Sequence, residues 1–147
     1  IELHYQVRYE VGHQATNIET LIFADVTLDD SGIRDRALTD QVTSGDDDII
    51  GTLLHGDVLS TGAGNDIVTG FGGNDVFVFT PGDGDDTIAD FENGIDLIRI
   101  IGGPNSFDDL KITEVNGDAI VPYSATDTII FDGIAADLLS QDDFKFV

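Results

Sequence analysis

Hydrophobic and polar residues alternate at several places along the chain, with the period of two that is typical of a half-buried β-strand. The clearest case is the first segment, where apolar side chains occupy every second position from Leu3 to Val11. A second apolar run at 20–24 predicts another strand, and the turn-prone residues 29–32 follow it. The only helical pattern is one short turn at 135–140. The pattern therefore predicts an all-β fold.

Ordinary strand patterns return after residue 100. Asn116-Gly117 predicts a type I′ hairpin turn between strands at 110–115 and 119–121. Residues 128–131 predict a further strand, and residues 143–147 close the chain with alternating apolar side chains. We therefore divide the chain into three regions. These are N-terminal flanking strands at 1–40, an unusual glycine-rich region at 41–100, and C-terminal capping strands at 101–147.

The central region is an internal repeat, because six aspartates recur at separations of 9 to 11 residues. An apolar residue stands two positions after every aspartate, and a glycine stands two positions before all but one, where His55 replaces it. The aspartates are Asp47, Asp57, Asp66, Asp75, Asp86 and Asp96. The apolar residues are Ile49, Leu59, Val68, Phe77, Ile88 and Ile98. The regular recurrence of these aspartates and apolar residues, which we call the repeat column, argues against the interpretation of the region as a disordered linker.

The net charge of the chain limits the kinds of molecule that it is expected to bind. The chain has 29 Asp and Glu residues against 6 Lys and Arg, a formal net charge of −23. A polyanion repels nucleic acid and anionic lipid, so cations are the expected partners. There are no cysteines, which excludes disulfides and zinc–thiolate sites. No stretch approaches the roughly 20 apolar residues of a membrane span, and no signal peptide is visible.

Two adjacent nine-residue segments, 61–69 and 70–78, resemble the nonapeptide of RTX, or hemolysin-type calcium-binding, proteins. Residues 75–79 and 82–91 are similar to the way such arrays end in serralysin-like and related secreted proteins. The resemblance covers residues 43–100 and extends more weakly to 101–147. It implies a parallel β-roll of nonapeptide repeats, flanked by capping β-strands.

In such a roll each repeat supplies a loop of about six residues and a strand of about three, and two repeats complete one turn. Repeat n then stacks on repeat n+2, which predicts the pairs 47/66, 57/75, 66/86 and 75/96. Calcium takes six to eight oxygen ligands, and two stacked glycine-rich loops with their carboxylates can offer them. Without the ion the stacked carboxylates repel one another.

We therefore expect about three to four calcium ions. The weakest site is that of Asp57, because the loop 52–56 lacks the glycines of the family. The insertion Thr80-Pro81 shifts the spacing of the later pairs. The resemblance alone adds Asp90, in the closing Ala-Asp-Phe motif, as a ligand. The expected metal-site residues are Gly45, Asp47, Asp57, Gly62, Gly64, Asp66, Gly73, Asp75, Gly84, Asp86, Asp90 and Asp96.

Catalytic readings find little support in the sequence. Paired carboxylates can act in glycoside hydrolysis, but the repeated acids here are equivalent and no cue singles out two of them. His4, His13 and His55 are scattered, and the glycine-rich stretch lacks the Gly-Lys-Ser/Thr of a phosphate loop. We expect a chain without catalytic activity of its own. It begins at Ile1 and contains no Met, so we also expect it to be part of a longer protein.

The resemblance implies a secreted, extracellular protein that is exported by type I secretion machinery, and residues 138–147 look like the uncleaved C-terminal signal of such proteins. Calcium would act as a folding switch after export. The alternative is an adhesion module that binds a glycan, ice or another surface ligand, with the roll as scaffold. Its only cue is the nine-residue spacing of Thr43, Thr52 and Thr61. A third possibility is the tail of a larger enzyme.

Overall fold

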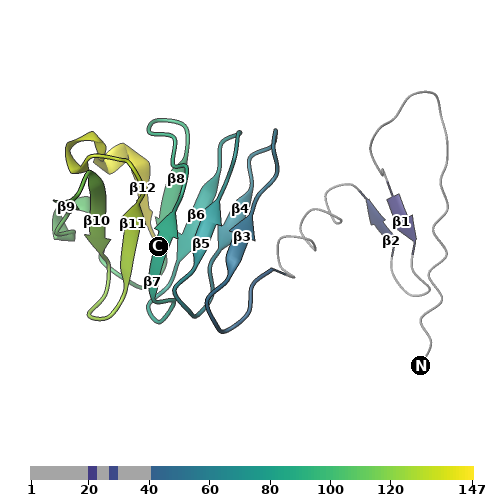
Figure 1. Cartoon of the computed structure of the whole chain (residues 1–147), viewed down its shortest axis with the longest axis horizontal. Helices are drawn as coiled ribbons and strands as arrows, with labels where there is room; N and C mark the ends of the chain where they lie inside the picture. The colour runs from purple at the N-terminus through teal and green to yellow at the C-terminus, as the bar shows by residue number, and fades with distance from the viewer. Residues whose placement is uncertain (1–19, 23–26, 30–40) are drawn as a thin grey trace. The chain divides into compact units, whose positions relative to one another are not determined.

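The computed structural model describes residues 20–22, 27–29 and 41–147 of the 147-residue chain. The chain forms two compact units, Ile1–Thr39 and Asp40–Val147. In the first unit, β1 (Thr20–Ile22) pairs antiparallel with β2 (Thr27–Asp29) (Figure 1). Residues 20–22 of the strand predicted at 20–24 thus form β1, and residues 23–24 lie outside the described residues. The strand predicted at 3–11 and the turn after Asp29 lie outside the described residues.

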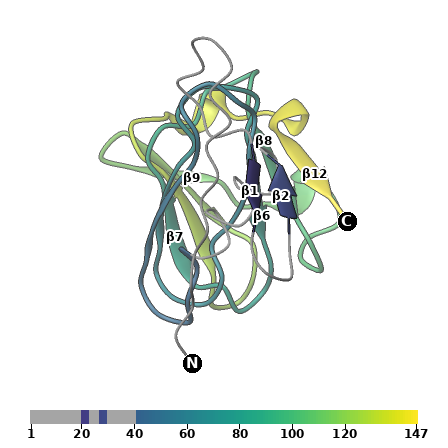
Figure 2. The ribbon, with the colours of Figure 1, turned by 90° about the vertical axis from the view of Figure 1, so that its right-hand side faces the viewer.

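The second unit is a roll of two sheets, and the strands from β3 to β8 alternate between them along the chain (Figure 1 and Figure 2). One sheet has the order β3-β5-β7-β11-β10-β9 and the other the order β12-β8-β6-β4. The strands of the repeat region are β3 (Asp48–Ile50), β4 (Val58–Ser60), β5 (Ile67–Thr69), β6 (Val76–Phe79), β7 (Asp85–Ile88) and β8 (Leu97–Ile100). Within this region, β3 to β6 each pair in parallel with the strand two places further along, as predicted for stacked repeats.

The middle of each short strand faces the core between the sheets. Ile49 aligns with Val68 in one sheet, and Phe77 aligns with Ile98 in the other. All six apolar residues of the repeat column are at most 2% exposed. Burial of such a side chain contributes about 1.5–3 kcal/mol, so this column accounts for much of the stabilisation of the roll. The repeat spacing therefore predicted the core correctly.

The C-terminal residues extend the roll. β9 (Thr113–Val115) and β10 (Asp118–Pro122) form a hairpin, and the positive φ angles of Asn116 (59°) and Gly117 (99°) confirm the type I′ turn. β11 (Thr128–Phe131) then runs parallel to β7, and β12 (Phe144–Phe146) runs parallel to β8. One further turn therefore stacks on the repeats, although these residues carry no repeat of their own.

Three single-turn 3-10 helices connect these strands. They are η1 (Phe107–Asp109), η2 (Ala136–Leu138) and η3 (Gln141–Asp143), and η2 confirms the helical turn expected at 135–140. Aromatic rings pack beside them, with Phe131 edge-on to Phe91 at 5.1 Å and Phe144 at 6.3 Å from Phe131. In the described part of the chain, no helix is long or apolar enough to cross a membrane.

Candidate metal centre

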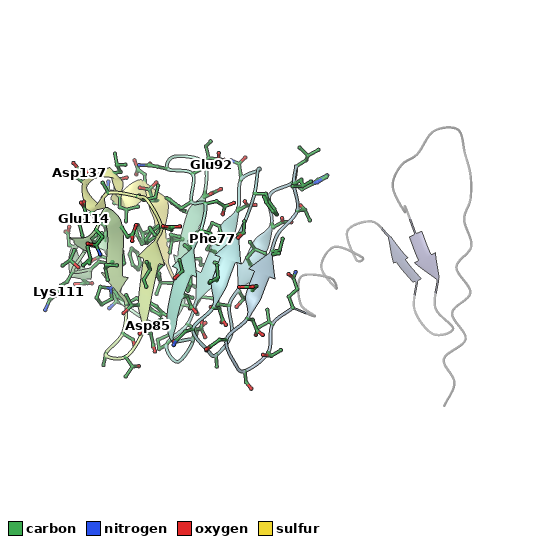
Figure 3. All side chains as sticks on the ribbon, in the orientation of Figure 1. Phe77, Asp85, Glu92, Lys111, Glu114 and Asp137 are labelled. Carbon is green, nitrogen blue, oxygen red and sulfur yellow. The ribbon has the colours of Figure 1, made fainter. Side chains whose placement is uncertain are left out.

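The repeat aspartates lie along two opposite edges of the roll, because successive loops lead alternately into one sheet and the other. Asp47 and Asp66 end the loops before β3 and β5, and Asp86 lies at the start of β7. The loops before β4, β6 and β8 carry the other three aspartates. Figure 3 shows this division, with Asp85 at one edge, Glu92 at the other and Phe77 between them.

Side chain to backbone hydrogen bonds join the aspartates of each edge into a ladder. In every pair, the backbone N–H of the earlier aspartate donates to Oδ1 of the aspartate one turn later. The donor–acceptor distances are 2.8 Å for Asp47/Asp66, 2.8 Å for Asp57/Asp75, 3.0 Å for Asp66/Asp86 and 3.0 Å for Asp75/Asp96. These are the four pairs predicted from the repeat, so the insertion at 80–81 does not break the stacking.

Two carboxylate oxygens on this ladder are buried without a hydrogen-bond partner, Oδ2 of Asp66 and Oδ2 of Asp75. Both side chains are 1% exposed. A buried unpartnered carboxylate oxygen is costly, because it has lost its hydration and gained nothing in exchange. One of these oxygens lies on each edge of the roll. A hard cation that prefers oxygen ligands fits this donor set, and calcium is such a cation.

Burial also changes the acidity of these groups. The pKa of Asp75 and the pKa of Asp86 are each raised to about 6, and the pKa values of Asp66 and Asp96 are raised as well. Loss of solvent is the largest cause in each case. Every Coulombic contribution on these four carboxyls comes from another aspartate and raises the pKa further. A bound divalent cation would lower these pKa values instead, because it favours the charged carboxylate.

Close stacking of the loops brings backbone carbonyls to the same edges. At Gly64 (φ 141°) an added Cβ would lie 2.6 Å from the carbonyl oxygen of Gly45, and at Gly73 (φ 142°) it would lie 2.5 Å from that of His55. Only glycine permits both this backbone conformation and this approach. The carbonyl oxygen of Gly64 in turn lies against Gly84. Gly62 also has a positive φ, of 83°.

Within residues 41–147 the structure brings no group of three or more His, Cys, Asp or Glu side chains together at a single point. The geometry of the roll explains this, because each loop contributes one aspartate of the ladder. The remaining ligands of an ion between two loops would therefore be backbone carbonyl oxygens, which calcium accepts readily.

Asp90 occupies a different position from the ladder aspartates. Its Oδ1 accepts a hydrogen bond from the N–H of Gly70 at 2.9 Å, and its Oδ2 accepts one from the N–H of Phe71 at 2.8 Å. Phe71 is one of two described non-glycine residues with a positive φ, at 65°. Asp90 thus holds the strained start of the loop before β6. Its charge also raises the pKa of Asp75 and of Asp96.

The threonine column faces the aspartates. Thr43 donates to Asp47 at 2.8 Å, Thr52 to Asp57 at 2.9 Å and Thr61 to Asp86 at 3.0 Å, in each case from Oγ1 to Oδ2. Thr61 is 1% exposed. The three residues do not form an exposed array, which removes the feature that suggested an ice-binding face.

Two buried aspartates outside the repeats were missed by the sequence analysis. Asp127 accepts hydrogen bonds from the hydroxyls of Ser124 and Thr126 and from the N–H of Gly82, and the Ser124 hydrogen bond is the main reason that its pKa is lowered. Asp143 and Ser140 form a capping box around η3. The available signal was a serine three positions before each aspartate.

Comparison with known proteins supports the fold. No protein-family model matches the sequence, and no curated protein matches it. The extracellular lipase LipA from Serratia marcescens is a structural match with a TM-score of 0.56 and 20% identity, covering 87% of this chain and 24% of the lipase. The chain therefore spans about a quarter of that protein.

A second match is the AlgE6R3 subunit from the Azotobacter vinelandii mannuronan C5-epimerase. It has a TM-score of 0.41 and 20% identity, and it covers 69% of this chain and 78% of that subunit. From residue 41 onward, the described structure is an all-β fold built on a parallel, RTX-like β-roll, which β9 to β12 extend at its C-terminal end.

Proposed function

We propose that this chain is an RTX-type calcium-binding module in which ion binding and folding are coupled. The observation that carries the proposal is the pair of buried, unpartnered oxygens on Asp66 and Asp75. They lie at stacked loop positions, and the pKa of both carboxyls is raised by burial first and by neighbouring aspartates second. A polyanionic fold with such oxygens in its interior gains more from a divalent cation than from any other simple partner.

In this function Asp66 and Asp75 would hold the ions, together with carbonyl oxygens of the glycine-rich loops above and below them. A bound calcium ion would supply positive charge and would be coordinated by oxygens of both turns. Asp86 and Asp96 hold the turns in register through their Oδ1 atoms, as Oδ1 of Asp66 and of Asp75 also does. The glycines let the loops approach closely enough to share an ion. Because these positions exist only when turns are stacked, the free energy of ion binding becomes free energy of folding.

The wider role is part of the same proposal. We place the module outside the cell, as a non-catalytic part of a larger secreted protein. The structural match to an extracellular lipase, of which it covers only 24%, supports this setting, and so does the similarity of residues 138–147 to type I secretion signals. Low cytoplasmic calcium would leave the repeats loose enough for export. Calcium outside the cell would then fold them.

A calcium titration of the chelated chain, followed by far-UV circular dichroism, tests the coupling of binding to folding. We expect a cooperative gain of β-structure with calcium but not with magnesium, because magnesium dehydrates reluctantly and demands a strict octahedron. A spectrum that is already rich in β-structure in chelator, and that calcium leaves unchanged, would contradict the proposal.

The export role needs a separate experiment. The chain is expressed in a bacterium with a type I secretion system, either intact or without residues 138–147, and the protein in the medium is measured. We expect export of the intact chain only. Equal export of both forms would mean that these residues are not the signal, and this result would leave calcium binding untouched.

A further inference from the structure

The second carboxylate oxygen of each ladder aspartate differs from turn to turn. At the first turn it is saturated by a threonine. Oδ2 of Asp47 accepts from the backbone N–H of Thr43 at 2.7 Å and from its hydroxyl at 2.8 Å. Oδ2 of Asp57 accepts from the backbone N–H of Thr52 at 2.5 Å and from its hydroxyl at 2.9 Å. Both lone pairs of these oxygens therefore already have donors.

Thr61 breaks this pattern. It stands five residues before Asp66, as Thr52 stands five residues before Asp57, yet its hydroxyl donates to Oδ2 of Asp86 on the following turn. Asp86 thereby gains a partner, and Oδ2 of Asp66 is left without one. One buried hydroxyl thus decides which of two stacked carboxylates is satisfied.

The position equivalent to Thr52 and Thr61 in the next repeat is Gly70. A Cβ at this position would collide with Oδ2 of Asp75. No side chain donor can therefore reach this oxygen from within its own loop. At the last ladder position, Oδ2 of Asp96 accepts from the backbone N–H of Glu92 at 2.8 Å. Of the six ladder aspartates, only Asp66 and Asp75 keep a bare buried oxygen.

We propose that the threonines determine which aspartates bind calcium, so that Asp66 and Asp75 take the ions while Thr43, Thr52 and Thr61 satisfy Asp47, Asp57 and Asp86 without metal. A hydroxyl hydrogen on a carboxylate lone pair occupies the direction from which a cation would bind. The inference rests on the proposed calcium-binding function and refines it. The chain binds about two ions, rather than one for each of the stacked pairs.

The deciding variant is Thr61→Val, which keeps the shape of the side chain and removes the hydroxyl. Oδ2 of Asp86 then becomes a third bare, buried oxygen. Calcium bound per chain is measured by isothermal titration calorimetry on the chelated whole chain, with thermal unfolding in chelator and in calcium as a second readout. We expect about one additional ion relative to the wild type. We also expect a lower melting temperature in chelator and a larger increase on adding calcium.

Two controls accompany it. Thr61→Ser keeps the hydroxyl and should behave as the wild type. Thr69→Val removes a hydroxyl from the solvent-facing side of β5 and should leave the number of ions unchanged. If Thr61→Val does not fold even with calcium, Thr52→Val tests Asp57 instead, where it removes the hydroxyl from Oδ2 and leaves the backbone N–H of residue 52 as its remaining donor.

Equal calcium numbers in Thr61→Val and the wild type would overturn the inference, and so would a wild type that loads every stacked pair. Both results would leave the proposed function standing. A wild type that binds no calcium would instead remove the proposed function, and the inference with it. The two failures are therefore distinguishable from the wild-type measurement alone.

Discussion

Oδ1 of Asp75 accepts a hydrogen bond from the backbone N–H of Asp57 at 2.8 Å, while Oδ2 of the same carboxylate is buried without a partner. The two oxygens of one side chain thus have separate roles. One fixes the register between consecutive turns on this edge of the roll. The other leaves negative charge in a dry position, where the fold by itself does not compensate it.

Asp75→Asn separates the charge of this side chain from its shape. We expect the calcium concentration at the folding midpoint to rise at least roughly tenfold, because a ligand oxygen has lost its charge. In chelator the variant should be at least as stable as the wild type, since a buried charge has been removed. Calcium titrations and thermal unfolding measure the two effects. Asp48→Asn, on an exposed aspartate of β3, is the matched control, and an equal shift there would count against a specific site.

The raised pKa values predict how stability in chelator depends on pH. The folded-state pKa of Asp75 and that of Asp86 are about 6, above the ordinary value of 3.8, so the folded chain binds protons more tightly than the unfolded chain. This contribution to stability is fully present below pH 3.8 and is lost as the pH rises through about 6. The melting temperature in chelator should therefore fall between pH 4 and pH 7, over roughly this window.

The affinity of the chain for calcium should depend on pH in the opposite direction and increase as the pH rises. Protons compete with the ion for the same carboxylates, so the calcium midpoint should move to higher concentration as the pH is lowered from about 7.5 to about 5.5. Circular dichroism titrations at several pH values measure it. A calcium midpoint that does not change over this range would show that these carboxyls are not ligands.

Gly73→Ala tests the close approach of the loops. The added methyl group would meet the backbone of His55 at 2.5 Å, and the positive φ adds strain. Together these effects should cost about 2–4 kcal/mol of unfolding free energy, even in saturating calcium. Urea unfolding measures the loss. Gly82→Ala provides the comparison, because Gly82 also has a positive φ and nothing lies within 4 Å of its added Cβ. Equal losses of unfolding free energy in the two variants would mean that the positive φ alone causes the destabilisation.

Asp90→Ala tests whether Asp90 stabilises the loop before β6 through its hydrogen bonds or acts only as a calcium ligand. The change leaves the N–H groups of Gly70 and Phe71 without their acceptors, which should cost about 1–3 kcal/mol. If the hydrogen bonds stabilise the loop, the variant should lose this unfolding free energy both in chelator and in calcium. Loss in calcium alone would indicate that Asp90 acts only as a ligand. Urea unfolding under both conditions decides, with Asp132→Ala on the exposed residue after β11 as control.

Much of the roll could be predicted from local spacing. An aspartate two residues before an inward-facing apolar residue is a short-range pattern, and its recurrence at 9 to 11 residues sets which turn lies on which. Leu59 and Ile88 are buried where the period of two placed them, and the Asp66/Asp86 pair forms despite the inserted residues. Backbone geometry within a repeat is enough to determine these features.

The sequence by itself thus determined the strands and the core column of the repeat region, its stacked pairs and its excess of negative charge. The tertiary structure decided how each carboxylate is satisfied. Thr61 bonds to Asp86, 25 residues away, and β11 pairs with β7 across more than 40 residues of chain. Asp127 gains one of its donors in the same way, the N–H of Gly82 at a separation of 45 residues. Such contacts leave no periodic pattern in the sequence, because they depend on how distant turns pack against one another in the folded chain.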